Sequence, residues 1–323
     1  WLYGEGLSGT DLGFKYRQMG SEEWLTAQDV KVEGGSFSAC VKGLQTNTEY
    51  EVMAYSGENV SAVRSVTTES ITPLENGAFE HWSTIKKIVC PYLSEESAFW
   101  GTGNPGAAMV GATLTDKCED TRPGSNGYYS ARLESMFANM AGIGKFAAGN
   151  LFVGKYVSTV GTNGIVGFGR KFTSRPLALR LWVKYNCGAI DKIGTLPMGS
   201  ELKMGDKDTG SIFIALGTWT KEKYGVDASG EIKGTDDSPL IVDTRDKGTF
   251  FNPKSEAVVA YGELMLNESI TEWQEVVIPL EYTTTSVVPT HITIVCSASR
   301  LGDYFTGSTQ SVMWLDDMEL LYE

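Results

Sequence analysis

Residues 178–186 read Ala-Leu-Arg-Leu-Trp-Val-Lys-Tyr-Asn, and from Leu179 onward every second residue is aliphatic or aromatic. Successive side chains of a β-strand point to opposite faces of the sheet. The stretch therefore predicts a strand with one apolar face. Its other face carries Arg180, Trp182 and Lys184, so it is mostly polar with a single indole.

Similar strand-like runs recur through the C-terminal part of the chain, at residues 210–216, 274–279, 291–296 and 311–315. They are short and rich in β-branched residues, which is typical of strands. Residues 130–140 are the one serious helix candidate. The pattern predicts an all-β domain, with long polar connections at 186–209 and 217–248.

The N-terminal residues show a second strand pattern, with alternating runs at 12–17, 36–41 and 49–55. Leu44 precedes Tyr50 by six residues, and Tyr50 opens a strand. This spacing is typical of a tyrosine corner, in which the tyrosine hydroxyl bonds back to upstream backbone. Residues 1–70 thus resemble a fibronectin type III or immunoglobulin-like sandwich, which we expect to act as a spacer.

A domain boundary is predicted at residues 68–73, a polar stretch that ends in a proline, because proline cannot continue a strand ladder. The second domain is then expected at 74–323. The chain opens with Trp1, so we expect a processed or trimmed product. Five widely spaced cysteines predict mainly free thiols, with a Cys90–Cys118 bridge left open.

Charge and hydropathy exclude two classes of partner. The net charge of −13, with no basic stripe, would repel nucleic acid. A membrane-spanning helix needs about 18 consecutive apolar residues, and the sequence contains no such run.

Hydrolysis of a glycosidic bond usually needs two carboxylates, one of them with a raised pKa. Among 40 Asp and Glu residues no pair stands out, and Glu134 is only a weak catalytic candidate. A Ser-His-acid triad could use only His81 or His291, and neither has the expected Gly-x-Ser-x-Gly setting.

Several stretches together resemble the PCMD family, a carbohydrate-metabolism domain of gut Bacteroidetes. They are residues 75–82, 148–154, 175–185, 297–308 and 314–322. The resemblance implies a jelly-roll sandwich similar to carbohydrate-binding modules. It also implies display at the outer-membrane surface or in the periplasm, through a removed lipoprotein signal and lipid anchor. It implies no known reaction.

In jelly-roll carbohydrate modules the opening and closing segments often share a structural Ca²⁺, an ion that takes six to eight oxygen ligands. Here Glu80 with Asp316 or Asp317 would supply the carboxylates. The alternative is that these acids lie at strand ends and meet water. No other cofactor is expected.

A sugar site needs flat aromatic faces and polar groups around them. The ligand-binding candidates are Arg180, Trp182, Lys184, Trp219, Arg300, Asp303 and Tyr304. Trp182 and Trp219 could instead serve ordinary packing. The leading hypothesis is binding of a polysaccharide or oligosaccharide in a cleft on strand 178–186, rimmed by loops near 219 and 300–305. The alternatives are a glycoside hydrolase or lyase of the same fold, and a structural adhesin or pilus-type surface protein.

Overall fold

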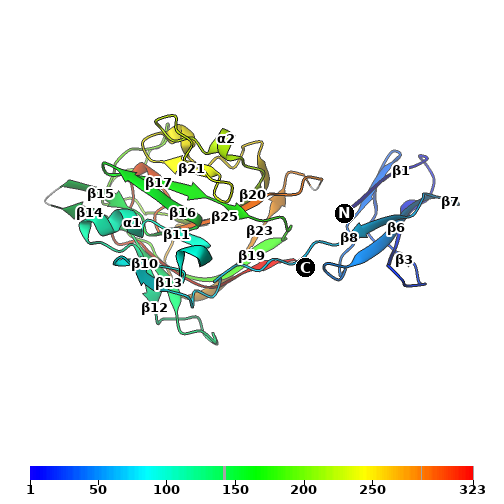
Figure 1. Ribbon diagram of the computed structural model, residues 1–323, viewed down its shortest axis with the longest axis horizontal. Coiled ribbons are helices and arrows are strands. Elements are labelled where there is room, and N and C mark those ends of the chain that lie inside the picture. Colours follow the sequence, from blue (N-terminus) through cyan, green and yellow to red (C-terminus); the bar gives the residue numbers. More distant parts are fainter. Residues whose placement is uncertain (141–142, 285, 323) are drawn as a thin grey trace. The chain divides into compact units, whose positions relative to one another are not determined.

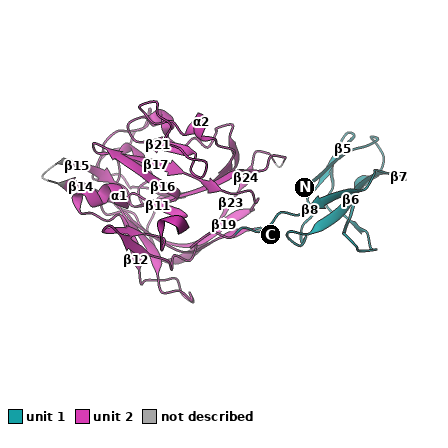
Figure 2. Cartoon of the chain, viewed as in Figure 1, with its two compact units in different colours: residues 1–72, 322–323 teal, residues 73–321 magenta. Residues whose placement is uncertain are grey.

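The computed structural model describes residues 1–140, 143–284 and 286–322. The chain divides into two compact units, residues 1–72 with Tyr322 and residues 73–321 (Figure 2). Strands make up 45% of the chain and helices 6%, which confirms the predicted all-β class. The division falls at the end of the proline-terminated stretch 68–73.

The first unit is a small sandwich of two sheets. One sheet has the order β1-β5-β4, and the other has the order β3-β2-β6-β7 with β8 also on β6. The strands of this unit are drawn in blue in Figure 1. Phe14 and Phe37, one from each sheet, meet in its core with ring centroids 4.7 Å apart. The strands are β1 (Leu2–Glu5), β2 (Leu12–Gln18), β3 (Leu25–Thr26), β4 (Lys31–Glu33), β5 (Ser36–Ala39), β6 (Glu49–Ser56), β7 (Asn59–Val60) and β8 (Arg64–Thr67).

Tyr50 has the hydrogen bond that the sequence predicts. Its side chain is buried, and its hydroxyl accepts the backbone N–H of Gln45 at 3.0 Å. The phenol therefore ties the turn before β6 to the core of the sandwich. The assignment of this unit to the fibronectin type III class stays a prediction.

The second unit is a sandwich of one five-stranded and one nine-stranded sheet. The five-stranded sheet has the order β12 (Thr115–Cys118), β13 (Ser130–Glu134), β26 (Val312–Leu321), β19 (Ala178–Asn186), β23 (Ile270–Pro279). The larger sheet has the order β21 (Leu240–Asp243), β17 (Asn163–Phe168), β16 (Asn150–Val160), β25 (His291–Ser297), β20 (Gly210–Gly217), β22 (Val258–Leu266), β24 (Glu281–Tyr282), with β11 (Trp100–Thr102) on β16 and β18 (Arg170–Lys171) on β25.

Two further antiparallel strand pairs and six short helices complete the described part of the second unit. The pairs are β9 (Ser83–Ile85) with β10 (Ile88–Cys90), and β14 (Met136–Met140) with β15 (Ile143–Ala147). The helices are α1 (Asn104–Ala107), α2 (Lys221–Tyr224), and the 3₁₀ turns η1 (Glu95–Ser97), η2 (Ala108–Val110), η3 (Lys247–Thr249) and η4 (Gly302–Tyr304). In the described part of the chain, no helix has the length and apolarity needed to cross a membrane.

The helix predicted at residues 130–140 is wrong, because this stretch forms β13 and β14. Ala131 and Leu133 are fully buried, whereas Arg132 between them is partly exposed, which is the period of two of a strand. Ala131 lies opposite Leu315 of β26. Pairing with this neighbouring strand outweighs the local helix preference.

The core lies between the two sheets. Leu179, Leu181 and Val183 of β19 are fully buried, as are Ile212 and Ile214 of β20 in the opposite sheet. Removing this apolar surface from water stabilises the fold by roughly 25 cal/mol for each Å² buried. Burial of the apolar face of β19 leaves its polar face directed outward. All five cysteines are free thiols, so the Cys90–Cys118 bridge is absent.

The two connections that flank β21, residues 218–239 and 244–257, pack against the nine-stranded sheet. A second buried cluster forms there, in which Trp219 packs with Phe152, Ala215 and Val258. Trp219 is only 2% exposed and meets Phe251 edge to face. The connection predicted at 217–248 therefore contains the edge strand β21, and its remaining residues include Trp219 of this packed cluster.

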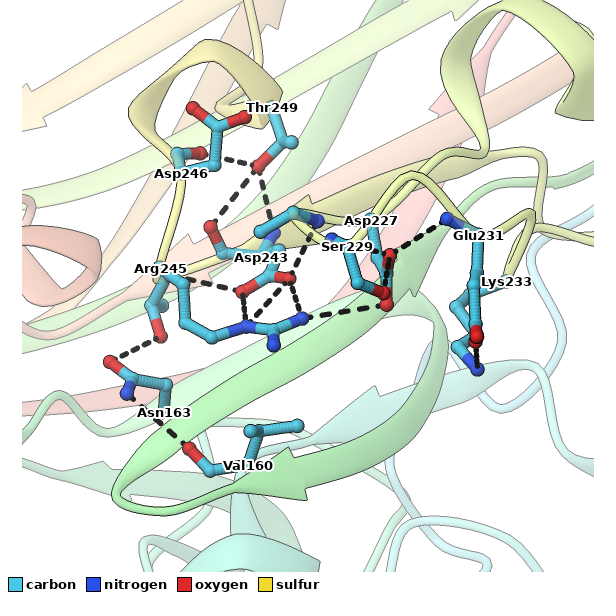
Figure 3. A network of polar contacts seen from close by, with 12 residues as sticks. Val160, Asn163, Asp227, Ser229, Glu231, Lys233, Asp243, Arg245, Asp246 and Thr249 are labelled. Atoms are coloured by element: carbon cyan, nitrogen blue, oxygen red, sulfur yellow. Dashed lines mark hydrogen bonds and ion pairs between the residues drawn. The ribbon is translucent and has the colours of Figure 1, made fainter.

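A polar network fixes the same segment at β21 (Figure 3). Arg245 donates to both carboxylate oxygens of Asp243, and its Nη2 also approaches Asp227 at 3.4 Å. Burial alone would raise the pKa of Asp243, but hydrogen bonds from Arg245 and the backbone outweigh it and keep the pKa below its usual value. The network holds a buried carboxylate in its charged form.

Candidate functional site

The outer face of the five-stranded sheet carries the polar side of β19. Arg180, Trp182 and Lys184 are partly exposed there, while their neighbours along the strand are buried. Trp314 of β26 lies opposite Lys184 on one side and opposite Arg132 of β13 on the other. The face therefore combines indoles with cations from neighbouring strands.

Lys184 is closed off from ligand by its own partners. Its ammonium group lies 5.2 Å from the ring centre of Trp273 and 5.1 Å from that of Trp314. It also pairs with Asp120, which accepts the indole N–H of Trp273 at 3.1 Å. The side chain of Lys184 is only 14% exposed, so this end of the face is already packed.

An open cleft of about 730 Å³ lies at the other end of the same face. Its floor comes from β19, β23 and β26, and its wall from the loop that precedes β13. The lining residues are Ala78, Glu80, Arg122, Asn126, Gly127, Arg180, Trp182, Glu275, Asp317, Met318 and Glu319. Two predicted ligand-binding residues, Arg180 and Trp182, and two predicted calcium ligands, Glu80 and Asp317, thus share one cleft.

A β-bulge in β26 shapes the floor of this cleft. Arg180 lies opposite Glu319, but Trp182 lies opposite Asp316, so β26 holds one extra residue between them. Asp317 in the bulge has a φ of 41°, a left-handed conformation that is uncommon outside glycine. Bulges re-aim side chains next to functional sites. Here the bulge turns Asp317 toward Arg122.

Arg122 connects the wall of the cleft to its floor. Its Nε donates to Asp317 at 2.5 Å, and its backbone N–H donates to Asp316 at 2.8 Å. Its guanidinium carbon lies 5.4 Å from the ring centre of Trp182, within the range of a cation–π contact. The wall is therefore attached to both the bulge and the indole.

Glu80 holds the same wall from the other side. Its carboxylate accepts the backbone N–H groups of Tyr128 at 3.0 Å and Tyr129 at 2.9 Å. A Cβ at Gly127 would lie 2.3 Å from the Glu80 carboxylate, so a larger residue there would require Glu80 to shift. Glycine at 127 thus leaves the Glu80 carboxylate in place against the loop.

Arg180 lies between two acids. It pairs with Glu319 on the neighbouring β26, and its Nη1 is 3.6 Å from Glu275 on β23. All three side chains are more than 40% exposed, so solvent screens these pairs. They present donors and acceptors side by side at the cleft surface.

Asp316 lies beneath the cleft and is fully buried. Burial raises its pKa to about 6, against the lowering effect of the N–H donated by Arg122. Because the side chain is closed to solvent, this carboxyl cannot reach a ligand in the cleft. It acts by holding the loop and the bulge together.

Glu80, Asp316 and Asp317 do not fit the calcium site that the family resemblance implies. The opening and closing segments do run side by side, since Met318 N–H donates to the carbonyl of Gly77 at 2.8 Å. However, the three carboxylates accept N–H groups of the loop or pair with Arg122. Among the residues that the structure describes, no group of three His, Cys, Asp or Glu could hold a metal ion.

The weak catalytic candidate, Glu134, lies on the same sheet but does not line the cleft. Its carboxylate is 2.6 Å from Nη1 of Arg132. A general acid must instead be free to donate a proton to the glycosidic oxygen, and Glu134 is engaged by Arg132 outside the cleft.

Arg300, Asp303 and Tyr304 are not brought to the cleft. They follow β25 of the nine-stranded sheet, where Arg300 lies 3.9 Å from Glu263 of β22. Tyr304 packs edge to face on Phe250 with ring centroids 5.1 Å apart. The predicted rim therefore divides between separate places, with Trp219 inside the second buried cluster.

Sequence reasoning missed three cleft residues, Arg122, Glu275 and Glu319. Arg122 lies in the stretch 119–127, which reads Glu-Asp-Thr-Arg-Pro-Gly-Ser-Asn-Gly and combines turn residues with charges. Loops held by a rigid scaffold often carry function, so this composition was a usable signal. Glu275 and Glu319 carried no such signal in the sequence, because they become neighbours of Arg180 only through strand pairing.

Comparison with known proteins supports a carbohydrate context. The model of the family described as "Putative carbohydrate metabolism domain" (PCMD) matches residues 78–321. The sequence matches no curated protein.

Two crystal structures described as putative glycoside hydrolases are similar in fold to this chain. The one from Bacteroides thetaiotaomicron has a TM-score of 0.56 and 19% identity, and the match covers 93% of this chain and 85% of that chain. The one from Bacteroides vulgatus has a TM-score of 0.53 and 20% identity, with 78% of this chain and 98% of that chain covered. At such identities the likeness shows the fold alone.

Proposed function

The chain belongs to the PCMD family, and from this premise we propose that it binds a glycan, without cleaving it, in the cleft on β19. The observation that carries the proposal is the position of Trp182. Its partly exposed indole lies at the floor of the cleft, with Arg122 and Arg180 beside it. A sugar ring has an apolar face that packs on an indole, and its hydroxyls need charged or polar partners around the ring.

The state of the acids favours binding over hydrolysis. Asp317 pairs with Arg122, and both Glu275 and Glu319 lie against Arg180. Each of these three carboxylates is thus engaged by a guanidinium group, whereas hydrolysis needs a carboxyl that is free to donate a proton to the glycosidic oxygen. Asp316 has a raised pKa, but it is buried out of reach of the cleft.

The test is a glycan array of plant and gut polysaccharides, followed by calorimetry on each hit. We expect Trp182→Ala to lower the affinity at least tenfold. The matched control is Trp24→Ala, because Trp24 also lies under an arginine, with the guanidinium carbon of Arg17 4.5 Å from its ring centre, but in the first unit. This control should leave the affinity unchanged.

The same hits are then incubated with the protein and the products separated by chromatography. Intact glycan is the expected result. Appearance of shorter products would replace the binding proposal with the hydrolase alternative, and absence of any hit would remove the glycan proposal altogether.

We further propose that the first unit acts as a spacer and that the protein works at the cell surface or in the periplasm. The family resemblance supports this setting. Protease treatment of intact cells, followed by immunoblotting, tests it. Full protection of the protein in intact cells and in cells with a permeabilised outer membrane would contradict both locations.

A further inference from the structure

The charges in the β19 cleft are unevenly distributed. Among the lining residues that the structure describes, four carry carboxylates and two carry guanidinium groups. The carboxylates are those of Glu80, Glu275, Asp317 and Glu319. The cleft therefore has an excess of two negative charges, on a chain whose net charge is −13.

Both guanidinium groups already have carboxylate partners. Arg122 donates to Asp317, and Arg180 lies between Glu319 and Glu275. An anionic ligand would have to compete with these acids for the same guanidinium groups. It would also bring its own charge toward the excess carboxylates, and like charges repel across a site of this size.

An uncharged sugar meets no such barrier. Adjacent carboxylate and guanidinium groups offer acceptors and donors for neighbouring hydroxyls, while the part of the Trp182 indole that is exposed beside Arg122 meets the ring face. From this charge arrangement we infer that the cleft takes neutral sugar residues and excludes uronic acids and sulfated sugars. The inference rests on the proposed function, because it concerns the specificity of the same cleft.

The first test compares oligosaccharides that differ only in charge. The probes are β-1,4-mannotriose with β-1,4-trimannuronate, and cellotriose with its C6-oxidised triuronate, titrated calorimetrically in 150 mM NaCl. At least one neutral trisaccharide should bind, and its uronate counterpart should bind at least tenfold more weakly. Tighter binding of a uronate than of its neutral counterpart would overturn the inference and leave the proposed function standing. Binding of no glycan on the array or in this panel would remove both.

A charge-neutral double variant gives a sharper test. Glu275→Gln with Glu319→Gln keeps the side-chain sizes, frees Arg180 and removes two negative charges from the cleft. The ratio of uronate affinity to neutral-trisaccharide affinity should then rise at least tenfold, because the charge that repels the uronate is removed while both variants of each side chain can still accept a hydroxyl. An unchanged preference in this variant would contradict the inference.

The matched control is Glu268→Gln with Glu281→Gln, which changes the net charge equally. Glu268 pairs with Lys207, and Glu281 is an exposed residue of β24, so neither lines the cleft. Its preference for neutral sugar should equal that of the wild type. If the double variant of the cleft fails to fold, as judged by circular dichroism, Glu319→Gln alone should still raise uronate binding by about threefold.

Discussion

Arg122 lies over Trp182, with its guanidinium carbon 5.4 Å from the ring centre, while its Nε donates to Asp317 at 2.5 Å. One side chain thus joins the loop that precedes β13, the indole of β19 and the bulge of β26. The planar guanidinium group can stack and form a directed hydrogen bond at once, which an ammonium group cannot.

Replacing Arg122 by alanine should weaken glycan binding about tenfold, because the wall of the cleft loses its contacts with the floor. The affinity of Arg122→Lys should lie between that of the wild type and that of Arg122→Ala, because lysine keeps the charge but not the planar guanidinium group. Calorimetric titration with a glycan identified on the array measures the effect. Arg132→Ala is the control, because Arg132 lies 5.9 Å from the ring centre of Trp314 outside the cleft. An equal loss of glycan affinity in Arg122→Ala and Arg132→Ala would contradict a specific role for Arg122.

Glu80→Ala should release the loop, because the N–H groups of Tyr128 and Tyr129 lose their acceptor. Hydrogen exchange at these two amides should accelerate at least tenfold, and the affinity for glycan should fall with it. Glu80→Gln keeps one oxygen as acceptor and should show a smaller change. Unaltered exchange in Glu80→Ala would show that other contacts hold the loop.

Arg245→Ala should destabilise the second unit, because it leaves the buried carboxylate of Asp243 without its main partner. Breaking a buried pair in this way is strongly destabilising, and we expect the melting temperature to fall by about 5 °C or more. The control is Arg300→Ala, since Arg300 is about half exposed and lies 3.9 Å from Glu263. Its melting temperature should change by less than about 2 °C. If the melting temperature of Arg245→Ala falls as little as that of Arg300→Ala, the network of Figure 3 contributes little to stability.

Asp316 predicts a pH dependence of stability. Burial raises its pKa to about 6 in the folded protein, above the unfolded value of about 3.9, so the folded state binds more protons between these values. This contribution is therefore fully present below about pH 4 and is lost as the pH rises through 6.

Asp316→Asn removes this titration. From pH 4 to pH 7 the free energy of unfolding of the wild type should fall relative to that of the variant by up to about 3 kcal/mol. Urea unfolding at pH 4, 5, 6 and 7 measures the difference. A difference that does not vary with pH would show that Asp316 keeps the same protonation state throughout.

Calcium should not stabilise the protein, because the three carboxylates proposed as its ligands already bind N–H groups or Arg122. Scanning fluorimetry with 5 mM CaCl₂ and with EDTA should give the same melting temperature. A rise with calcium in the wild type that is absent in Asp317→Ala would restore the metal site.

Local pattern was enough to predict the strands. The alternation in residues 178–186 placed Leu179 inside and Trp182 outside, because a strand's side chains have a fixed period. The hydroxyl contact of Tyr50 was predictable for a similar reason, since its partner lies only five residues away along the chain. Pattern failed at residues 130–140, where the pairing of β13 with β26 decided the conformation.

By itself, the sequence determined the all-β class, the buried and exposed faces of β19, and a polar, indole-bearing surface. Only the tertiary structure decided what surrounds that surface. The bulge at Asp317, the cation over Trp182 and the two acids beside Arg180 come from segments up to 195 residues apart. Such contacts depend on strand order and register, which are properties of the assembled sheet rather than of any one stretch of chain.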